Sequence, residues 1–117
     1  MNPVDTAIKQ NEIDGFLMYE DSDDSDMYYA TGLDRSDSFI YLRNNGESKI
    51  YVSVMEYSRA RKEAQVDKVI NRSRFEFDSI SELIRKIAEE EDIQRLGVKE
   101  DFPLKIADNL REDLEVE

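Results

Sequence analysis

The chain has 117 residues with 28 acidic and 16 basic side chains, a formal net charge of -12, and neither cysteine nor histidine. These absences exclude thiolate zinc sites, cysteine nucleophiles and Ser-His-Asp triads. The charge disfavours nucleic acid and anionic membranes as partners, because binding them relies on clustered lysine and arginine. The length predicts a single domain.

The distribution of apolar residues indicates where in the cell the protein is located. No apolar run approaches the ~20 residues needed to cross a bilayer, and residues 1–14 lack the apolar segment of a signal peptide. We therefore expect a cytoplasmic protein whose acidic residues form a solvated surface.

The first third of the chain predicts a helix, a buried strand and a second helix. Residues 3–12 begin with Pro3, a residue suited to the first helical position, and carry apolar side chains on one face. The apolar run 15–19 is too short for a helix and is typical of a central strand buried on both faces. Residues 26–31 predict one or two helical turns, which Gly32 ends in a left-handed conformation.

A polar loop at 34–37 leads into a predicted antiparallel hairpin. Its strands are 39–42 and 50–54, rich in β-branched and aromatic residues, and 44–46 supply turn residues that tolerate positive φ. Residues 55–64 then predict a helix from the spacing of their apolar side chains.

The last part of the chain predicts strands alternating with helices. A brief strand at 66–70 precedes the most regular amphipathic pattern, 80–88, which starts with capping-box spacing between Ser79 and Glu82. A short strand at 96–98 and a final helix from Asp101 to Leu114 complete the chain. The predicted fold is therefore α/β, a mixed sheet with an antiparallel hairpin, flanked by helices.

The acidic segment after the first strand resembles the start of a calcium loop, with carboxylates at 21, 23, 24 and 26. An EF-hand would need glycine where Asp26 stands and glutamate where Gly32 stands. Calcium binding stays open beside the alternative of a solvated loop that caps the next helix.

A phosphoacceptor receiver domain is a second alternative. Glu20 and Asp21 follow the first predicted strand and Lys99 follows the last. The strand 50–54, however, does not end in the aspartate that such a domain phosphorylates, and a hairpin contradicts an all-parallel sheet.

A more specific resemblance covers nearly the whole chain. The segment 27–33 with its Tyr-x-Thr-Gly-Leu pattern, the polar loop, the hairpin with a glycine at its tip, and a helix bearing a glutamate follow one another in order. The matching residues are Tyr29, Thr31, Gly32, Leu33, Ser36, Gly46 and Glu56. The set resembles the N-terminal domain of the creatinase, prolidase and Xaa-Pro aminopeptidase family, and we assign residues 1–117 to such a domain.

The resemblance implies a ribonuclease H-like fold and a catalytic centre that lies in a different domain. In this family the chemistry belongs to a C-terminal pita-bread domain, in which two aspartates, one histidine and two glutamates hold two divalent metal ions, Mn, Co or Zn. This chain has no histidine and ends where that domain would begin. The expectation is a noncatalytic domain without catalytic residues, metal ligands or cofactor, from a parent metallopeptidase that cleaves Xaa-Pro bonds as a dipeptidase or aminopeptidase.

The resemblance also implies partners and contact residues. Domains of this family pack on the catalytic C-terminal domain, shape the cleft for a proline-containing peptide and contribute to homodimer contacts. Tyr29, Arg35 and Asp37 are the candidate substrate-binding residues, Arg35 through its bidentate guanidinium. Packing and backbone geometry offer a structural explanation for Tyr29, Thr31 and Gly32.

Two alternatives remain for function. The chain can be a stand-alone module of the same fold that binds a ligand or a protein. It can also be the N-terminal domain of a creatinase-like amidinohydrolase, which changes the substrate and not the fold. The sequence that follows residue 117 would separate these possibilities.

Overall fold

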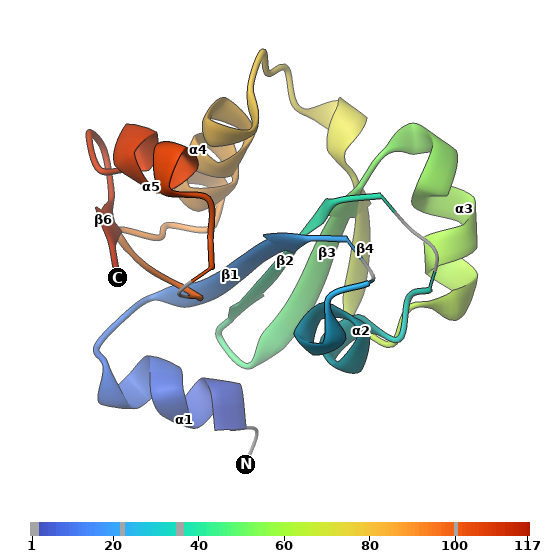
Figure 1. Cartoon of the computed structure of the whole chain (residues 1–117), viewed down its shortest axis with the longest axis horizontal. Helices are drawn as coiled ribbons and strands as arrows, with labels where there is room; N and C mark the ends of the chain where they lie inside the picture. Colours follow the sequence, from blue (N-terminus) through green and yellow to red (C-terminus); the bar gives the residue numbers. More distant parts are fainter. Residues whose placement is uncertain (1–2, 22, 35–36, 100) are drawn as a thin grey trace. The chain divides into compact units, whose positions relative to one another are not determined.

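The computed structural model describes residues 3–21, 23–34, 37–99 and 101–117. Helices and strands alternate along most of the chain (Figure 1). The strands are β1 (Gly15–Glu20), β2 (Phe39–Asn44), β3 (Glu47–Val52), β4 (Lys68–Asn71), β5 (Arg95–Val98) and β6 (Glu115–Val116). The α-helices are α1 (Pro3–Gln10), α2 (Ser25–Thr31), α3 (Val54–Glu63), α4 (Ile80–Glu90) and α5 (Leu104–Leu110), and a 3-10 helix spans Arg72–Arg74.

The strands form one mixed sheet in the order β4-β3-β2-β1-β5-β6. The β2–β3 pair is antiparallel, whereas β1–β5, β3–β4 and β5–β6 are parallel. The predicted α/β fold with a hairpin is therefore confirmed. β1 is one of the two innermost strands, as its continuous apolar run predicted.

Contacts between residues group the chain into two compact units. The terminal unit consists of Met1–Leu17 and Phe75–Glu117, and the hairpin unit consists of Met18–Arg74. The assignment of the whole chain to one domain stays a prediction.

The hairpin unit is organised by a two-residue turn. Asn45 and Gly46 join β2 to β3 with φ angles of 53° and 73°. Two consecutive positive φ angles match the right-handed twist of the flanking strands, which explains why asparagine and glycine stand there. The turn was predicted one residue too wide, because Asn44 still pairs with Glu47.

The boundary between β3 and α3 differs from the prediction. The strand was expected to run to Val54, but it ends at Val52, and Val54 is already helical. Ser53 is the N-cap residue, with the extended backbone that this position requires. The apolar run extended across this cap, so hydrophobicity alone placed the boundary too late.

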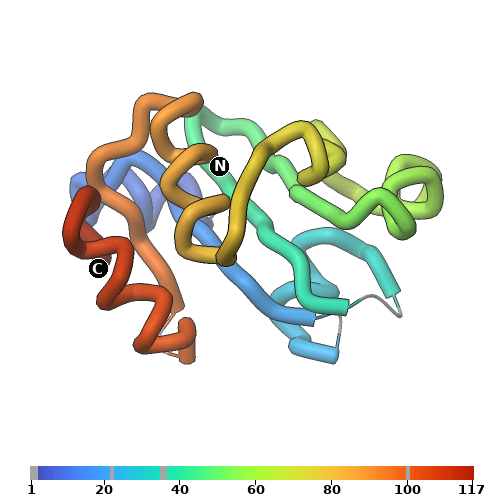
Figure 2. Tube along the Cα trace, turned by 90° about the horizontal axis from the view of Figure 1, so that it is seen from above, coloured from blue at the N-terminus to red at the C-terminus, as the bar shows by residue number. Residues whose placement is uncertain are grey.

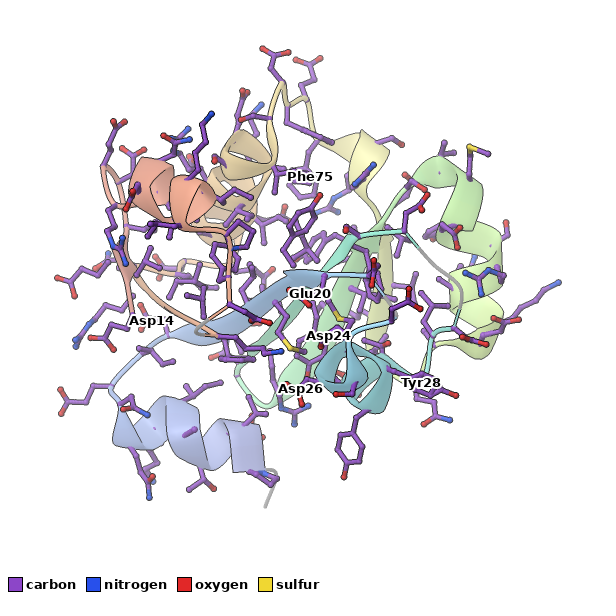
Figure 3. The ribbon with its side chains drawn as sticks, in the orientation of Figure 1. Asp14, Glu20, Asp24, Asp26, Tyr28 and Phe75 are labelled. Carbon is purple, nitrogen blue, oxygen red and sulfur yellow. The ribbon has the colours of Figure 1, made fainter. Side chains whose placement is uncertain are left out.

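In the terminal unit, α4 and α5 pack against each other, and Figures 1 and 2 both show them side by side. The predicted cap of α4 is confirmed, because the Ser79 hydroxyl accepts a hydrogen bond from the backbone N–H of Glu82. Asp14, labelled in Figure 3, joins β1 to β5. Its Oδ2 accepts from the backbone N–H groups of Gln94 and Arg95 at 2.8 and 2.9 Å.

The prediction of a final helix reaching Leu114 is wrong. α5 ends at Leu110, and the chain then forms β6, a strand that the pattern did not indicate. The backbone N–H of Leu114 still donates to the carbonyl oxygen of Leu110, four residues earlier. One helix-like turn therefore follows α5, and this is why the apolar spacing resembled that of a longer helix. The strand depends on distant backbone partners, with Glu117 N donating to Leu96 O at 2.8 Å.

Each unit has its own apolar interior. Helix α4 supplies more of the buried side chains in the terminal unit than any other element, followed by α5, and the hairpin strands supply most of those in the hairpin unit. In the part of the chain that the structure describes, we find no helix long and apolar enough to cross a membrane.

Candidate functional site

Helix α2 is short, and both of its ends are fixed by side-chain or backbone caps. The carboxylate of Asp24 accepts a hydrogen bond from Met27 N at 2.9 Å, and Gly32 ends the helix with a φ of 66°. The Thr31 hydroxyl is buried and donates to Met27 O at 2.9 Å. Backbone geometry and packing thus account for Thr31 and Gly32, as the sequence predicted. The helix-capping alternative for the acidic segment is confirmed at Asp24.

Tyr29 does not fit the packing explanation. Its side chain is 93% exposed, and that of the preceding Tyr28 is 47% exposed. Consecutive helical residues point about 100° apart, so the two rings cannot stack on each other. Figure 3 shows Tyr28 on α2, with Asp24 at the start of the same helix.

Both tyrosines line a hollow of about 660 Å³ that is open to solvent. The hollow lies within the hairpin unit. Its lining consists of Asp23, Ser25, Tyr28, Tyr29, Gly32 and Gln65. We call it the α2 hollow.

Arg59 of α3 anchors the segment that follows α2. Its Nη1 donates to the carbonyl oxygen of Asp34 at 2.5 Å and to Glu63 Oε2 at 2.9 Å, and its Nη2 donates to Glu56 Oε2 at 2.5 Å. These contacts raise the pKa of Arg59, first through the hydrogen bond with Glu56. Glu56, one of the residues that carried the family resemblance, therefore helps to orient an arginine that contacts the backbone of Asp34.

The α3–β4 connection is fixed at two points. Gln65 N donates to Thr31 O at 2.6 Å, which brings the connection to the end of α2. Asp67 Oδ2 accepts from Ser48 N at 2.8 Å and from the Ser48 hydroxyl at 3.2 Å. The hydrogen bond from the Ser48 backbone is the main reason why the pKa of Asp67 lies below its ordinary value.

The Asp67 contact predicts a pH dependence of stability. Because the folded-state pKa of Asp67 is lowered, its contribution is complete above the unfolded value of about 4 and is lost as the pH falls through the folded value. We expect Asp67→Asn to unfold at lower urea concentration than the wild type at pH 7. The difference should shrink as the pH approaches 3. A difference between the two proteins that is independent of pH from 3 to 7 would contradict this role.

The three predicted contact residues have different outcomes. Tyr29 lines the α2 hollow, and Asp37 is exposed in the α2–β2 connection but does not line the hollow. Arg35 lies outside the described residues. Sequence reasoning missed Gln65 and Arg59 as parts of this region, and it singled out Asp23 only as a candidate calcium ligand. The Tyr28-Tyr29 pair was a visible signal, whereas nothing local marked Gln65, which lies 34 to 40 residues after the residues of α2 in the sequence.

The two-metal centre that the family resemblance implies does not fit this chain. That ligand set includes a histidine, and the sequence contains none. We therefore assign no metal-dependent step to these residues.

Comparison with protein families decides the relationship. The model of the creatinase/prolidase N-terminal domain matches residues 2–117. The chain belongs to this family. A search of curated protein sequences found no match to this chain.

Solved structures have the same fold as this creatinase/prolidase N-terminal domain. A prolidase from Pyrococcus furiosus aligns with a TM-score of 0.72 and 19% identity, over 96% of this chain and 30% of that chain. An Xaa-Pro dipeptidase from Bacillus anthracis aligns with a TM-score of 0.76 and 17% identity, over 97% of this chain and 30% of that one. This domain thus spans less than a third of either protein.

A third structure is nearer in length. The N-terminal domain of the cytoplasmic peptidase PepQ from Mycobacterium tuberculosis H37Rv aligns with a TM-score of 0.71 and 15% identity, over 97% of this chain and 87% of that one.

Proposed function

We propose that this chain is the noncatalytic N-terminal domain of a metal-dependent Xaa-Pro peptidase, a dipeptidase or an aminopeptidase. One observation carries the proposal. The fold match covers nearly all of this chain and only 30% of a prolidase and of an Xaa-Pro dipeptidase. In the parent protein, two divalent ions (Mn, Co or Zn) would be held by the catalytic half.

Within that parent, the domain packs on the catalytic C-terminal domain, shapes one side of the substrate cleft and contributes to a homodimer, in the cytoplasm. Tyr29, Arg35 and Asp37 are the proposed contacts with a proline-containing peptide. The exposure of Tyr29 and Asp37 supports this role, because both side chains are accessible to a second molecule.

The alternatives are a stand-alone binding module and the N-terminal domain of a creatinase-like amidinohydrolase. The reading frame beyond codon 117 tests the proposal against both. Two aspartates, one histidine and two glutamates at metal-ligand spacing would support a peptidase or its amidinohydrolase relative, and activity on Xaa-Pro dipeptides against creatine would separate these two. A stop codon would support the stand-alone module.

The proposal predicts that the purified chain does not hydrolyse Xaa-Pro dipeptides. The reason is chemical, since a two-metal peptidase centre of this family needs a histidine that the chain lacks. The measurement is proline release from Ala-Pro with Mn²⁺, Co²⁺ or Zn²⁺ added, compared with a chelator-treated sample. Proline release that requires metal and stops with chelator would contradict the noncatalytic assignment.

A further inference from the structure

The α2 hollow presents aromatic surface that the fold does not use. Among the large hydrophobic side chains that the structure describes, Tyr29 is the most exposed, at 93%, and it follows the half-exposed Tyr28. A tyrosine ring in such a position exposes apolar surface to water and contributes little buried area to the interior. Exposed aromatic rings at a concave site are typical of binding surfaces.

The polar groups of the hollow select the charge of an occupant. Asp23 contributes a carboxylate, Ser25 a hydroxyl and Gln65 an amide, and none of the described lining residues is lysine or arginine. Within the described residues, no ion pair to the Asp23 side chain is found. The hollow therefore attracts a cation and disfavours an anion.

The same unit contains a stacking contact between an arginine and a tyrosine ring. The guanidinium of Arg61 lies over the ring of Tyr57, 5.6 Å from its centroid. Arginine stacks on aromatic faces while its N–H groups still reach a carboxylate, a combination that the compact, strongly hydrated ammonium of lysine achieves less well.

We propose that the α2 hollow is a docking site for an arginine side chain presented by another protein chain. The guanidinium stacks on Tyr29 and donates to the Asp23 carboxylate. This inference deepens the proposed function, on which it rests for the idea that this surface meets a second polypeptide. Its test uses the isolated chain, so its failure would leave the peptidase assignment unaffected.

The probe is acetyl-Gly-Arg-Gly-amide, titrated into ¹⁵N-labelled chain at 150 mM NaCl and followed by amide chemical shifts. We expect the largest shifts in α2, at Asp23 and at Gln65. The peptide with citrulline in place of arginine keeps the shape and loses the charge, and should bind at least 5-fold more weakly. The lysine peptide should be weaker than the arginine peptide by about 2- to 5-fold, in line with the small size of exposed cation–π contacts.

Variants separate stacking from general charge attraction. Tyr29→Ala and Asp23→Asn should each weaken arginine-peptide binding by about 2- to 5-fold, as expected for single exposed contacts. Glu112→Gln removes one exposed carboxylate in the terminal unit, and Met55→Ala removes an exposed apolar side chain on α3. Neither control should change the affinity. Amide spectra of all four variants should keep the dispersion of the folded chain.

Three results would overturn the proposal. The first is a set of shifts spread over the acidic surface with equal affinities for the arginine and lysine peptides, which indicates nonspecific attraction. The second is unchanged affinity in Tyr29→Ala. The third is concentration-dependent dimerisation in sedimentation that perturbs the same α2 amides without peptide, because the occupant would then be a second copy of the chain.

Discussion

Replacing Leu83 with alanine should lower the free energy of unfolding by about 2–5 kcal/mol, the range for leucine truncation in close-packed interiors. Leu83 lies on the buried face of α4 and is 0% exposed. The truncation removes apolar area from the interior of the terminal unit and leaves a cavity there. Since small domains unfold with only about 5–15 kcal/mol, this single change should remove a large part of the total stability.

Urea unfolding followed by circular dichroism measures the effect. Glu89→Ala is the matched control, because Glu89 lies on the same helix with an exposed side chain. It should change stability by no more than about 0.5 kcal/mol. A Leu83→Ala protein within 1 kcal/mol of the wild type would mean that α4 does not pack as the structure indicates.

The contrast between α4 and β6 explains how much of the fold the sequence predicts. The boundaries of α4 follow from local signals, namely a serine cap and apolar residues at helical spacing. The hairpin is equally local, because Asn45 and Gly46 determine its turn. β6 has no local signal. It exists because Glu115 and Glu117 meet backbone partners about 20 residues earlier in β5 and just before it.

The candidate site follows the same division. The pattern identified α2, its glycine cap and Tyr29, since each depends on residues within one helical turn. It did not reveal that Tyr29 is exposed, because exposure depends on whether a distant segment covers the ring. Arg59 and Gln65 were missed for a related reason. Their contacts with Asp34 and Thr31 join segments more than 20 residues apart.

Replacing Asn44 with alanine should destabilise the chain by about 1–3 kcal/mol, because it takes an acceptor away from a buried ammonium group. Lys49, on β3, is only 4% exposed. Its Nζ donates to Asn44 Oδ1 at 2.6 Å and lies 3.5 Å from Glu47 Oε1. Glu47 Oε1 also lies 3.2 Å from Nζ of Lys68, which is largely exposed.

Removing one partner of a buried polar pair costs more stability than replacing both partners with apolar side chains. Alanine at position 44 leaves the Lys49 ammonium buried with one acceptor fewer, so the desolvation cost is no longer offset by that bond. Changing both residues to apolar side chains, in Asn44→Leu with Lys49→Met, removes the charge together with its acceptor. The double variant should therefore be more stable than Asn44→Ala and close to the wild type.

A double-mutant cycle measured by urea unfolding tests this account. The single changes Asn44→Leu and Lys49→Met and the double variant should give an interaction energy of about 0.5–3 kcal/mol, as found for side chains in direct contact. Lys68→Met is the control. It removes a lysine that contacts the same glutamate from an exposed position, and should cost at most about 1 kcal/mol. Single changes that add without interaction would show that the bond between Asn44 and Lys49 does not stabilise the hairpin. If they couple, the cation buried beside the Asn45–Gly46 turn depends on that bond, and the polar end of β2 and β3 is part of what stabilises the hairpin unit.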